Sequence, residues 1–221
     1  MSISDDGVGI FHKIQNAFGL DDPREAILEL AKGKLTTDPA RHTGEGIFFS
    51  SRSCDAFYIQ ASGLLFSGAG EEDWLVRTTD LETIAPKKAV LWSAFQSVDS
   101  TTVVMKINNN SKKTLEDIFE EFASEDEDFG FVRTHIPILL ADYGADGLMS
   151  RSKAKRVVSG VGKFKEVVLD FSGVERIGQA FADEIFRVYA NAHPDVNIQY
   201  MNAAPAVERL IRRALAKKDD G

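Results

Sequence analysis

The chain has a single cysteine, Cys54, and no long hydrophobic run in its 221 residues. One cysteine excludes an internal disulfide and fits a reducing compartment. No apolar segment approaches the roughly 20 residues that a membrane-spanning helix needs. The first residues are acidic and contain glycine, unlike a signal peptide. We therefore expect a cytoplasmic protein without a membrane partner.

An excess of positive charge is also missing. The formal net charge is −8, and residues 116–128 hold eight acidic and no basic side chains. Because that stretch alone carries −8, the remainder of the chain sums to about zero, and no overall field attracts nucleic acid. We expect no direct nucleic-acid binding. The hydrophobic content of 43% is enough for a buried core, and the length suits one large or two small domains.

The first half of the chain predicts helices on a largely antiparallel sheet. Asp22-Pro23-Arg24-Glu25 has the residues of a helix start, with a capping aspartate, a proline in the first helical position and a glutamate that can complete a capping box. This helix is expected to end at Gly33. Residues 34–46 predict a loop, and Ile47–Ser51 predicts a short helix. Short β-branched or aromatic segments predict five strands: Phe57–Ala61, Leu64–Phe66, Trp74–Arg77, Val90–Phe95 and Thr101–Ile107.

The second half alternates strands and helices, which predicts a small α/β domain with partly parallel pairing. The expected strands are Phe131–Ala141, Glu166–Phe171 and Val196–Met201. The expected helices are Arg151–Ser159, Gln179–Ala192 and Pro205–Lys217.

An acidic segment separates the two halves. Leu115, Ile118, Phe119 and Phe122 place one apolar stripe on a predicted helix whose other positions are acidic. We predict two domains, residues 1–110 and 131–218, joined by an acidic helix and linker at 111–130. The acidic run is either a solvated face, which we favour, or a docking surface for a basic partner.

Three features of the first half together indicate a nucleotide site. Asp5-x-Gly7-x-Gly9 follows a short strand start at Ile3, and offers a carboxylate for an adenine amino group beside glycines that admit a ligand to the backbone. His42-Thr43-Gly44-Glu45-Gly46 precedes a helix whose first amides can face phosphate. Ser100-Thr101-Thr102 opens a late strand with hydroxyls that can face the adenine site. Each alone is more typical of a plain turn, and only their order and spacing favour the nucleotide interpretation.

These segments resemble the GHKL superfamily, which includes histidine kinases, DNA gyrase B and Hsp90. SDDGVGIFHKI and HTGEGIFFSSR resemble its two glycine boxes, and STTVVMKI resembles its closing strand. The resemblance covers about residues 2–108 and implies a partial Bergerat-type α/β sandwich that binds ATP or ADP. The residues implied to bind nucleotide are Asp5, which reads the adenine amino group, Gly7, Gly9, Gly44, Gly46 and Thr101.

One position departs from the family, and another has two possible roles. Ser100 stands where the family has a glycine. His42 lies in the implied lid, where it is either a phosphate contact or a plain loop residue.

The sequence departs from that family by an absence. The family has an Asn-bearing helix before the first glycine box, which holds Mg²⁺, often with a Glu that activates water, but only four residues precede Asp5. Metal binding and hydrolysis therefore have no identifiable residues, and we expect weak or no hydrolysis. We expect the chain to be a fragment, a degenerate module, or a domain that another chain completes. An incomplete layer exposes apolar surface, which favours association, including a homodimer.

The second half resembles a STAS-like family of unknown function that is commonly fused behind a GHKL-type ATPase. The most telling segments are Leu169-Asp170-Phe171 and the block 177–184. The resemblance covers about residues 131–215 and implies a protein partner. STAS domains that antagonise anti-sigma factors carry a phosphorylatable serine at a position that aligns with Gly178-Gln179-Ala180, where this chain has no hydroxyl. Ser172 is interpreted as part of a turn.

Other chemistry is less well supported by the sequence. Asp183 and Glu184 suggest an acid/base pair, but we favour a surface stripe or a pairing with the basic segment 151–156. The four histidines show no metal-ligand spacing. Cys54 has no neighbour in sequence that would activate it, so a buried, inert thiol is expected.

These observations predict a bacterial cytosolic regulatory protein that couples an adenine-nucleotide site to a STAS-like interaction domain. The alternative is a non-catalytic interaction or dimerisation module with a vestigial nucleotide site. A histidine-kinase-type phosphotransferase is disfavoured, because its upstream helices and phospho-acceptor region are not seen in the sequence.

Overall fold

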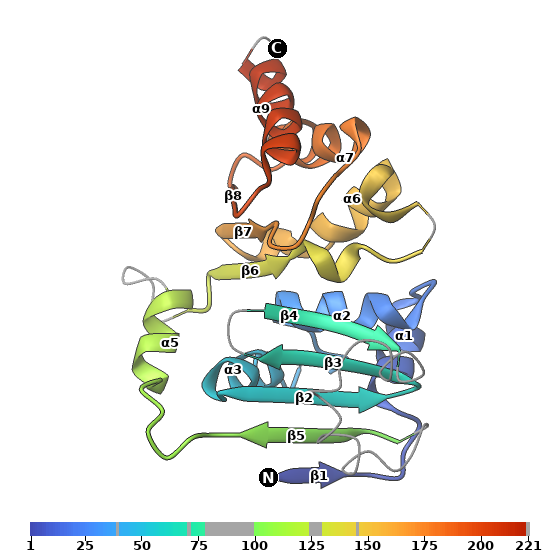
Figure 1. Cartoon of the computed structure of the whole chain (residues 1–221), viewed down its shortest axis with the longest axis vertical. Coiled ribbons are helices and arrows are strands. Elements are labelled where there is room, and N and C mark those ends of the chain that lie inside the picture. Colours follow the sequence, from blue (N-terminus) through green and yellow to red (C-terminus); the bar gives the residue numbers. More distant parts are fainter. Residues whose placement is uncertain (39, 70–71, 78–99, 124–129, 145, 220–221) are drawn as a thin grey trace. The chain divides into compact units, whose positions relative to one another are not determined.

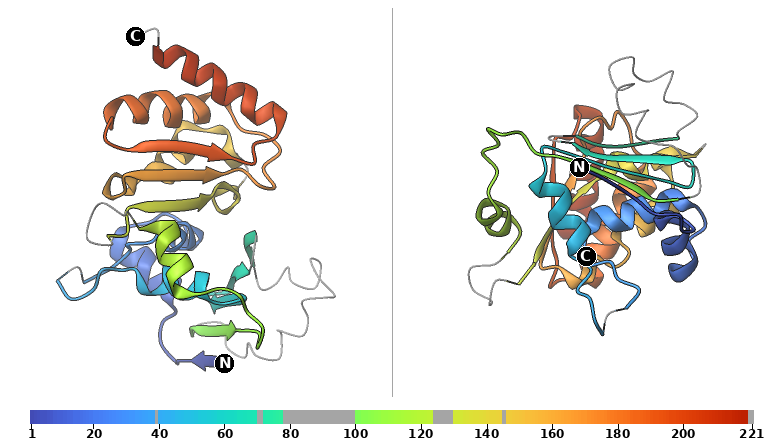
Figure 2. Two further views of the ribbon diagram at one scale, coloured as in Figure 1. Left: turned by 90° about the vertical axis from the view of Figure 1, so that its left-hand side faces the viewer. Right: turned by 90° about the horizontal axis from the view of Figure 1, so that it is seen from below.

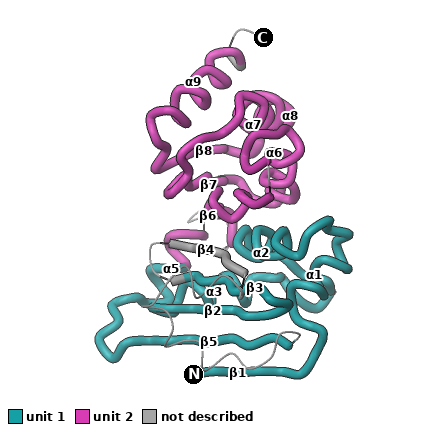
Figure 3. The backbone as a smooth tube through the Cα atoms, turned by 45° about the vertical axis from the view of Figure 1, so that its right-hand side comes forward, with its two compact units in different colours: residues 1–118 teal, residues 119–221 magenta. Residues whose placement is uncertain are grey.

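The computed structural model describes residues 1–38, 40–69, 72–77, 100–123, 130–144 and 146–219 (Figure 1). The chain divides into two compact units, Met1–Ile118 and Phe119–Gly221 (Figure 3). The division falls within the segment 111–130, which the sequence predicts as a linker. The predicted strand Val90–Phe95 lies outside the described residues.

The first unit contains a five-stranded sheet in the order β1-β5-β2-β3-β4, with every neighbouring pair antiparallel. The strands are β1 (Ser2–Ser4), β2 (Ala56–Ala61), β3 (Leu64–Ala69), β4 (Glu72–Arg77) and β5 (Thr102–Lys106). The antiparallel sheet that the sequence predicts is thus confirmed. Its first strand lies beside its last, since Ser4 pairs with Thr102. This pairing brings together two segments that are nearly the length of the unit apart in sequence.

Three helices lie on one face of this sheet, as the right-hand view of Figure 2 shows. They are α1 (Ile10–Phe18), α2 (Pro23–Lys32) and α3 (Gly46–Ser53). The predicted cap of α2 is confirmed, because Oδ1 of Asp22 accepts the amide of Arg24 at 2.9 Å. The core of the unit is made of apolar side chains from helices and strands, among them Phe11, Ile27, Phe48, Ile59 and Leu65. Each such side chain contributes roughly 1.5–3 kcal/mol to stability through burial.

The second unit contains a parallel three-stranded sheet in the order β6-β7-β8. Its strands are β6 (Arg133–Pro137), β7 (Glu166–Asp170) and β8 (Asn197–Met201). Ile136, Leu169 and Tyr200 form one row across it. The ring of Tyr200 lies 5.8 Å from that of Phe186, so this face of the sheet packs on helix. The predicted parallel pairing is confirmed.

Helices follow each strand of the second unit. They are α6 (Arg151–Val158), α7 (Gln179–Asp183), η6 (Glu184–Tyr189), α8 (Ala190–Ala192) and α9 (Pro205–Asp219), with short 3-10 turns at η3 (Ile138–Ala141), η4 (Gly147–Met149) and η5 (Val161–Lys163). The helical run 179–192 is continuous, as predicted, but η6 within it is a π-helix. Such segments are rare and often mark functional sites. The predicted strand 131–141 is shorter than expected, because the backbone turns into η3 after Pro137.

Helix α5 (Leu115–Phe122) spans the boundary between the two units. The hydroxyl of Thr114 accepts the amide of Asp117 at 3.0 Å and so caps the helix start. The ring of Phe122 is buried and lies 6.2 Å from that of Phe131. Of the predicted apolar stripe, Ile118 and Phe122 are buried, whereas Leu115 and Phe119 are exposed. Two of the four side chains in the apolar stripe of the acidic helix are therefore buried, and two are exposed.

Candidate functional site

Four of the residues predicted to bind nucleotide meet at the turn between β1 and α1. Oδ1 of Asp5 accepts the amide of Gly7 at 2.9 Å and the amide of Thr101 at 3.1 Å. The amide of Asp5 donates in turn to the carbonyl of Thr101 at 3.0 Å. These contacts hold the aspartate of the first turn against the threonine that precedes β5. The pairing of β1 with β5 produces this arrangement.

Thr101 also joins β5 to the start of α1. The helix begins after Gly9, which has a φ of 79° and no side chain that could cap it. The Oγ1 atom of Thr101 accepts the amide of Ile10 at 3.0 Å instead. A hydroxyl from the neighbouring strand therefore satisfies one of the free amides of this helix. Glycine is favoured at position 9 because the backbone φ there is positive.

The Asp5 carboxylate is exposed and ionised at neutral pH. Its pKa is held below the usual value first by the amide of Thr101 and then by that of Gly7, which outweigh a small opposing effect of burial. Two amides use only part of the acceptor capacity of a carboxylate. The turn can therefore accept a further donor such as an exocyclic amino group.

The remaining three predicted residues lie in the loop that leads to α3. His42 is exposed, and its amide donates to the carbonyl of Asp38 at 3.0 Å. Gly44 has a φ of 77°, and a Cβ there would overlap the carbonyl of Leu35. Gly46 is the first residue of α3. In Figure 2 this loop, drawn in light blue, projects away from the helices.

The loop and the Asp5 turn remain separate. Among the described residues, no hydrogen bond or ion pair joins them. Hydrogen bonds therefore gather Asp5, Gly7 and Thr101 beside Gly9, and no described hydrogen bond or ion pair connects His42, Gly44 or Gly46 to them.

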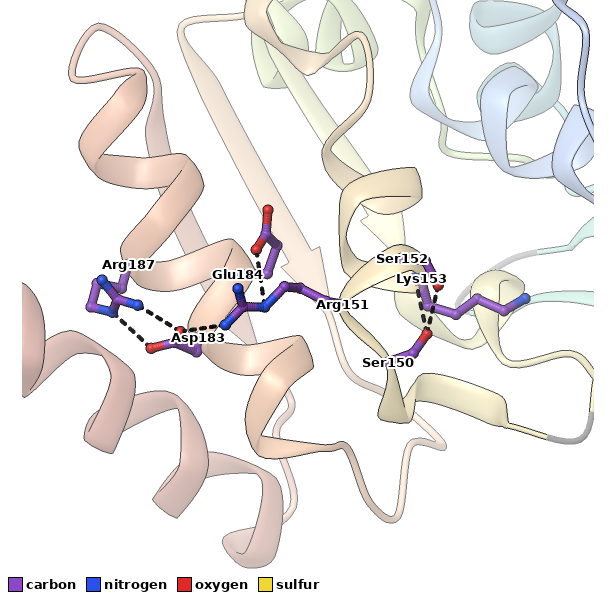
Figure 4. Close-up of polar contacts among 7 residues, drawn as sticks. All are labelled: Ser150, Arg151, Ser152, Lys153, Asp183, Glu184 and Arg187. Carbon is purple, nitrogen blue, oxygen red and sulfur yellow. Dashed lines mark hydrogen bonds and ion pairs between the residues drawn. The ribbon is translucent and has the colours of Figure 1, made fainter.

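A second cluster lies in the second unit, where charged side chains gather between α6 and the helix 179–192 (Figure 4). Arg187 donates two hydrogen bonds of 2.7 Å to Asp183. Arg151 lies 3.5 Å from Asp183 and 3.6 Å from Glu184. The predicted pairing of these acids with the basic segment 151–156 is confirmed for Arg151. The partner Arg187 was not foreseen, although its four-residue spacing from Asp183 is the signal for it.

The electrostatics of this cluster argue against acid/base chemistry by Asp183 at neutral pH. Its pKa is lowered, first by the hydrogen bonds from Arg187 and also by the charges of Lys217 and Arg151. The pKa of Arg187 is raised by the same bonds. Both partners are therefore held in their charged forms. Glu184 is only 5% exposed, so Arg151 balances a nearly buried carboxylate.

Two cavities flank the helix that carries these acids. One has a volume of about 530 Å³ and is lined by Arg151, Gln179, Ala180, Asp183, Arg187 and Lys217. The other has a volume of about 430 Å³, and its polar lining residues are Lys155, Ser159, Glu184, Tyr189 and His193. The rings of Tyr189 and His193 stack with centroids 4.1 Å apart. Neither cavity was predicted from the sequence.

A family comparison identifies part of this unit. Residues 153–208 match the STAS-like domain of unknown function, DUF4325. The STAS-like domain thus includes β7, β8 and the helical run 179–192 between them. No curated protein and no solved structure matches the chain.

One glycine of the STAS-like domain explains why its helix 179–192 starts without a side-chain cap. Gly178 occupies the N-cap position, and its amide donates to the carbonyl of Leu148 at 2.9 Å. A Cβ at Gly178 would overlap the carbonyl oxygen of Met149. The serine, threonine, aspartate or asparagine that usually caps a helix is therefore excluded here.

Among the described residues of both units, none of the helices combines the length and the apolar character of a membrane-spanning segment. The same residues contain no group of three His, Cys, Asp or Glu side chains that could hold a metal ion. Cys54 is buried, as predicted, and burial is the main cause that raises the pKa of its thiol.

Proposed function

We propose that this protein is a regulatory protein that couples adenine-nucleotide binding in its first unit to protein interaction through its STAS-like domain. The observation that carries the proposal is the contact of Asp5 with Thr101. These are the adenine-reading aspartate and the closing-strand threonine that the GHKL resemblance implies, and they lie 96 positions apart in sequence. A Bergerat-type arrangement of the sheet would bring them together in this way.

Asp5 would bind the adenine ring through its ionised carboxylate. The two backbone amides fix the orientation of this carboxylate, and its remaining lone pairs accept the exocyclic amino group. Gly7 beside it leaves room for the ring, because it has no side chain. The loop 34–46 would then order around the phosphates, with Gly44 and Gly46 at its end. No residue that would hold Mg²⁺ is assigned, so binding rather than hydrolysis is the proposed event.

Signal transfer would follow from the change in this loop. A ligand shifts a conformational equilibrium only through different affinities for the two states. Ordering of a segment by phosphate contacts is one established form of such a switch. Helix α5, which has residues in both units, is the segment that would carry the change to the STAS-like domain.

Thermal unfolding with excess ADP or ATP, with and without Mg²⁺, tests the proposal. Nucleotide at about 100 times its Kd stabilises the bound state by about 2.7 kcal/mol, which corresponds to a midpoint shift of roughly 5–10 °C at this size. Asp5→Asn keeps an acceptor for the two amides but removes the charge. Asp6→Asn is the matched control, because Asp6 is an exposed neighbour outside these contacts.

The results of this experiment distinguish a working adenine site from its absence. A shift that is kept in Asp6→Asn and lost in Asp5→Asn supports an adenine site at this turn. A shift that does not depend on Mg²⁺ fits a site without metal ligands. The absence of any shift at millimolar nucleotide would refute the nucleotide function.

A second candidate function is a protein-interaction module in which the turn is purely structural. It is favoured by the two backbone amides that already occupy Oδ1 of Asp5. It is favoured also by the exposure of large apolar side chains in this unit, among them Ile3 (54%), Val8 (71%) and Ile107 (67%). Sedimentation analysis that shows association weakened by Val8→Ser, together with no nucleotide shift, would support this candidate.

A further inference from the structure

The larger of the two cavities described above, about 530 Å³ in volume, brings together three cations from three separate helices. Arg151 comes from α6, Arg187 from η6 and Lys217 from α9. Asp183 is the acidic residue in the cavity lining. Glu184 lies 3.6 Å from Arg151 and is not among the lining residues. With three positive and two negative charges, the cluster has a net positive charge.

The three cations differ in how much of their hydrogen-bonding capacity is used. Arg187 is matched by Asp183 through two short hydrogen bonds. Arg151 lies 3.5 and 3.6 Å from its two carboxylates, which is longer than a charge-assisted hydrogen bond. Lys217 forms no hydrogen bond or ion pair with the residues that the structure describes. Arg151 and Lys217 therefore have donors that remain available to a ligand.

The rest of the cavity lining also suits an anion. Gln179 and Ala180 begin the continuous helical run 179–192, so the positive end of its dipole lies at the cavity. The Gln179 side chain is exposed and adds an amide donor. Concave surfaces with one excess sign of charge concentrate ligands of the opposite sign.

We propose that this cavity binds a phosphate group, with Arg151 and Lys217 as its principal ligands. The planar guanidinium group of arginine matches the oxygens of phosphate in a bidentate geometry, and lysine contributes a point charge. The Arg187–Asp183 pair carries no net charge and forms one side of the site. Its two hydrogen bonds hold both side chains in place on the helix. The volume exceeds that of phosphate alone, so the group would be carried by a larger molecule. This inference does not depend on the nucleotide site of the first unit.

Titration of the full chain with inorganic phosphate, followed by amide NMR at constant ionic strength, tests the inference. We expect the amide signals of Gln179, Ala180 and Arg151 to move, while chloride at equal ionic strength leaves them unchanged. Lys217→Gln and Arg151→Gln should each weaken phosphate binding by about tenfold or more, because each removes a charged hydrogen bond. Arg212→Gln is the matched control on α9, because its guanidinium already donates to Glu208.

Two results would overturn the proposal. One is the absence of any shift at these amides, and the other is an equal weakening by Arg212→Gln, which would indicate general screening. Lys217→Gln keeps the test valid if Arg151→Gln fails to fold, because Lys217 has no described ion pair. Asp5→Asn should leave phosphate binding unchanged, which separates this site from the proposed nucleotide function.

A comparison of ligands identifies the source of the phosphate. Tighter binding of a phosphoserine peptide than of inorganic phosphate or phosphoserine would assign a phosphorylated partner. Equal affinity for all three would assign a small phosphate compound.

Discussion

Arg187 and Asp183 form a two-pronged ion pair within one helix, with Nε bound to Oδ1 and Nη2 bound to Oδ2 at 2.7 Å each. The pair lies four residues apart: Asp183 is the last residue of α7, and Arg187 lies in the π-helix η6. Because the π-helix alters the spacing of side chains, the fork geometry had to be seen in the structure. Its consequences for stability can be measured directly.

The first prediction concerns acid stability. The pKa of Asp183 lies below its ordinary value of 3.8 in the folded protein. Stability from this group is therefore present above the unfolded pKa and is lost as the pH falls through the lower folded pKa. Urea unfolding followed between neutral pH and acid should show Asp183→Asn as less stable than the parent at neutral pH. The difference should vanish in strong acid.

A matched variant makes this test specific. Asp146 is an exposed acid outside the cluster, so Asp146→Asn should follow the parent across the whole pH range. If Asp183→Asn kept a constant difference from the parent at every pH, packing rather than charge would explain it.

The second prediction concerns the carboxylate of Glu184. Arg151→Ala removes the cation that lies 3.6 Å from this nearly buried carboxylate, which should destabilise the unit by about 1–3 kcal/mol. Glu184→Gln should recover part of that loss in the double variant. A double-mutant cycle of urea unfolding measures the coupling. Strictly additive effects would mean that the two side chains do not interact.

The third prediction tests the close approach at Gly178. Gly178→Ala places a Cβ against the carbonyl of Met149, which should destabilise the second unit by about 1–3 kcal/mol. Gly162→Ala is the control, because a Cβ there meets only the hydroxyl of Tyr189 at an ordinary 3.7 Å. Chemical denaturation of both variants, side by side, should separate them. Equal stability would show that the segment around Met149 can move aside.

The fourth prediction distinguishes the two glycines of the loop before α3. Gly44→Ala combines a left-handed φ with an overlap on Leu35 and should destabilise the first unit by about 1 kcal/mol or more. Gly46→Ala meets nothing within 4 Å and lies in a helix, so it should stabilise by about 0.5–1 kcal/mol. Thermal unfolding should show a lower midpoint for Gly44→Ala and a higher midpoint for Gly46→Ala than for the parent. A loss in both variants would indicate that the loop backbone differs from the one described.

Local signals in the sequence predicted much of the fold. The helix start at Asp22-Pro23, the strands around Ile59 and Phe66 and the helix after Arg151 all follow from caps, turns and periodicity. Helix α1 was not predicted, although the spacing of Phe11 and Ile14, both buried, fits a helix. The neighbours of each strand could not be predicted, because periodicity contains no information on which distant strand pairs with β1.

The sequence bears differently on the residues of the two candidate sites. The family resemblance pointed to Asp5 and Thr101, and the structure brings them together. The cations Arg151, Arg187 and Lys217 come from three helices and share no sequence motif. Only the packing of those helices gathers them, so the cavity could not be predicted from the sequence beyond the spacing of Asp183 and Arg187.

The position of β1 has a consequence for how the first unit is made. This strand precedes the other strands of its sheet in the chain, yet the neighbour with which it forms a ladder is β5, and the hydroxyls of Ser4 and Thr102 meet at 2.9 Å across 98 positions of chain. On the ribosome, β1 must wait for nearly the whole unit to emerge before it can pair. Contacts this distant slow folding, because a long loop has to close first. The contact between Asp5 and Thr101 would therefore be among the last to form.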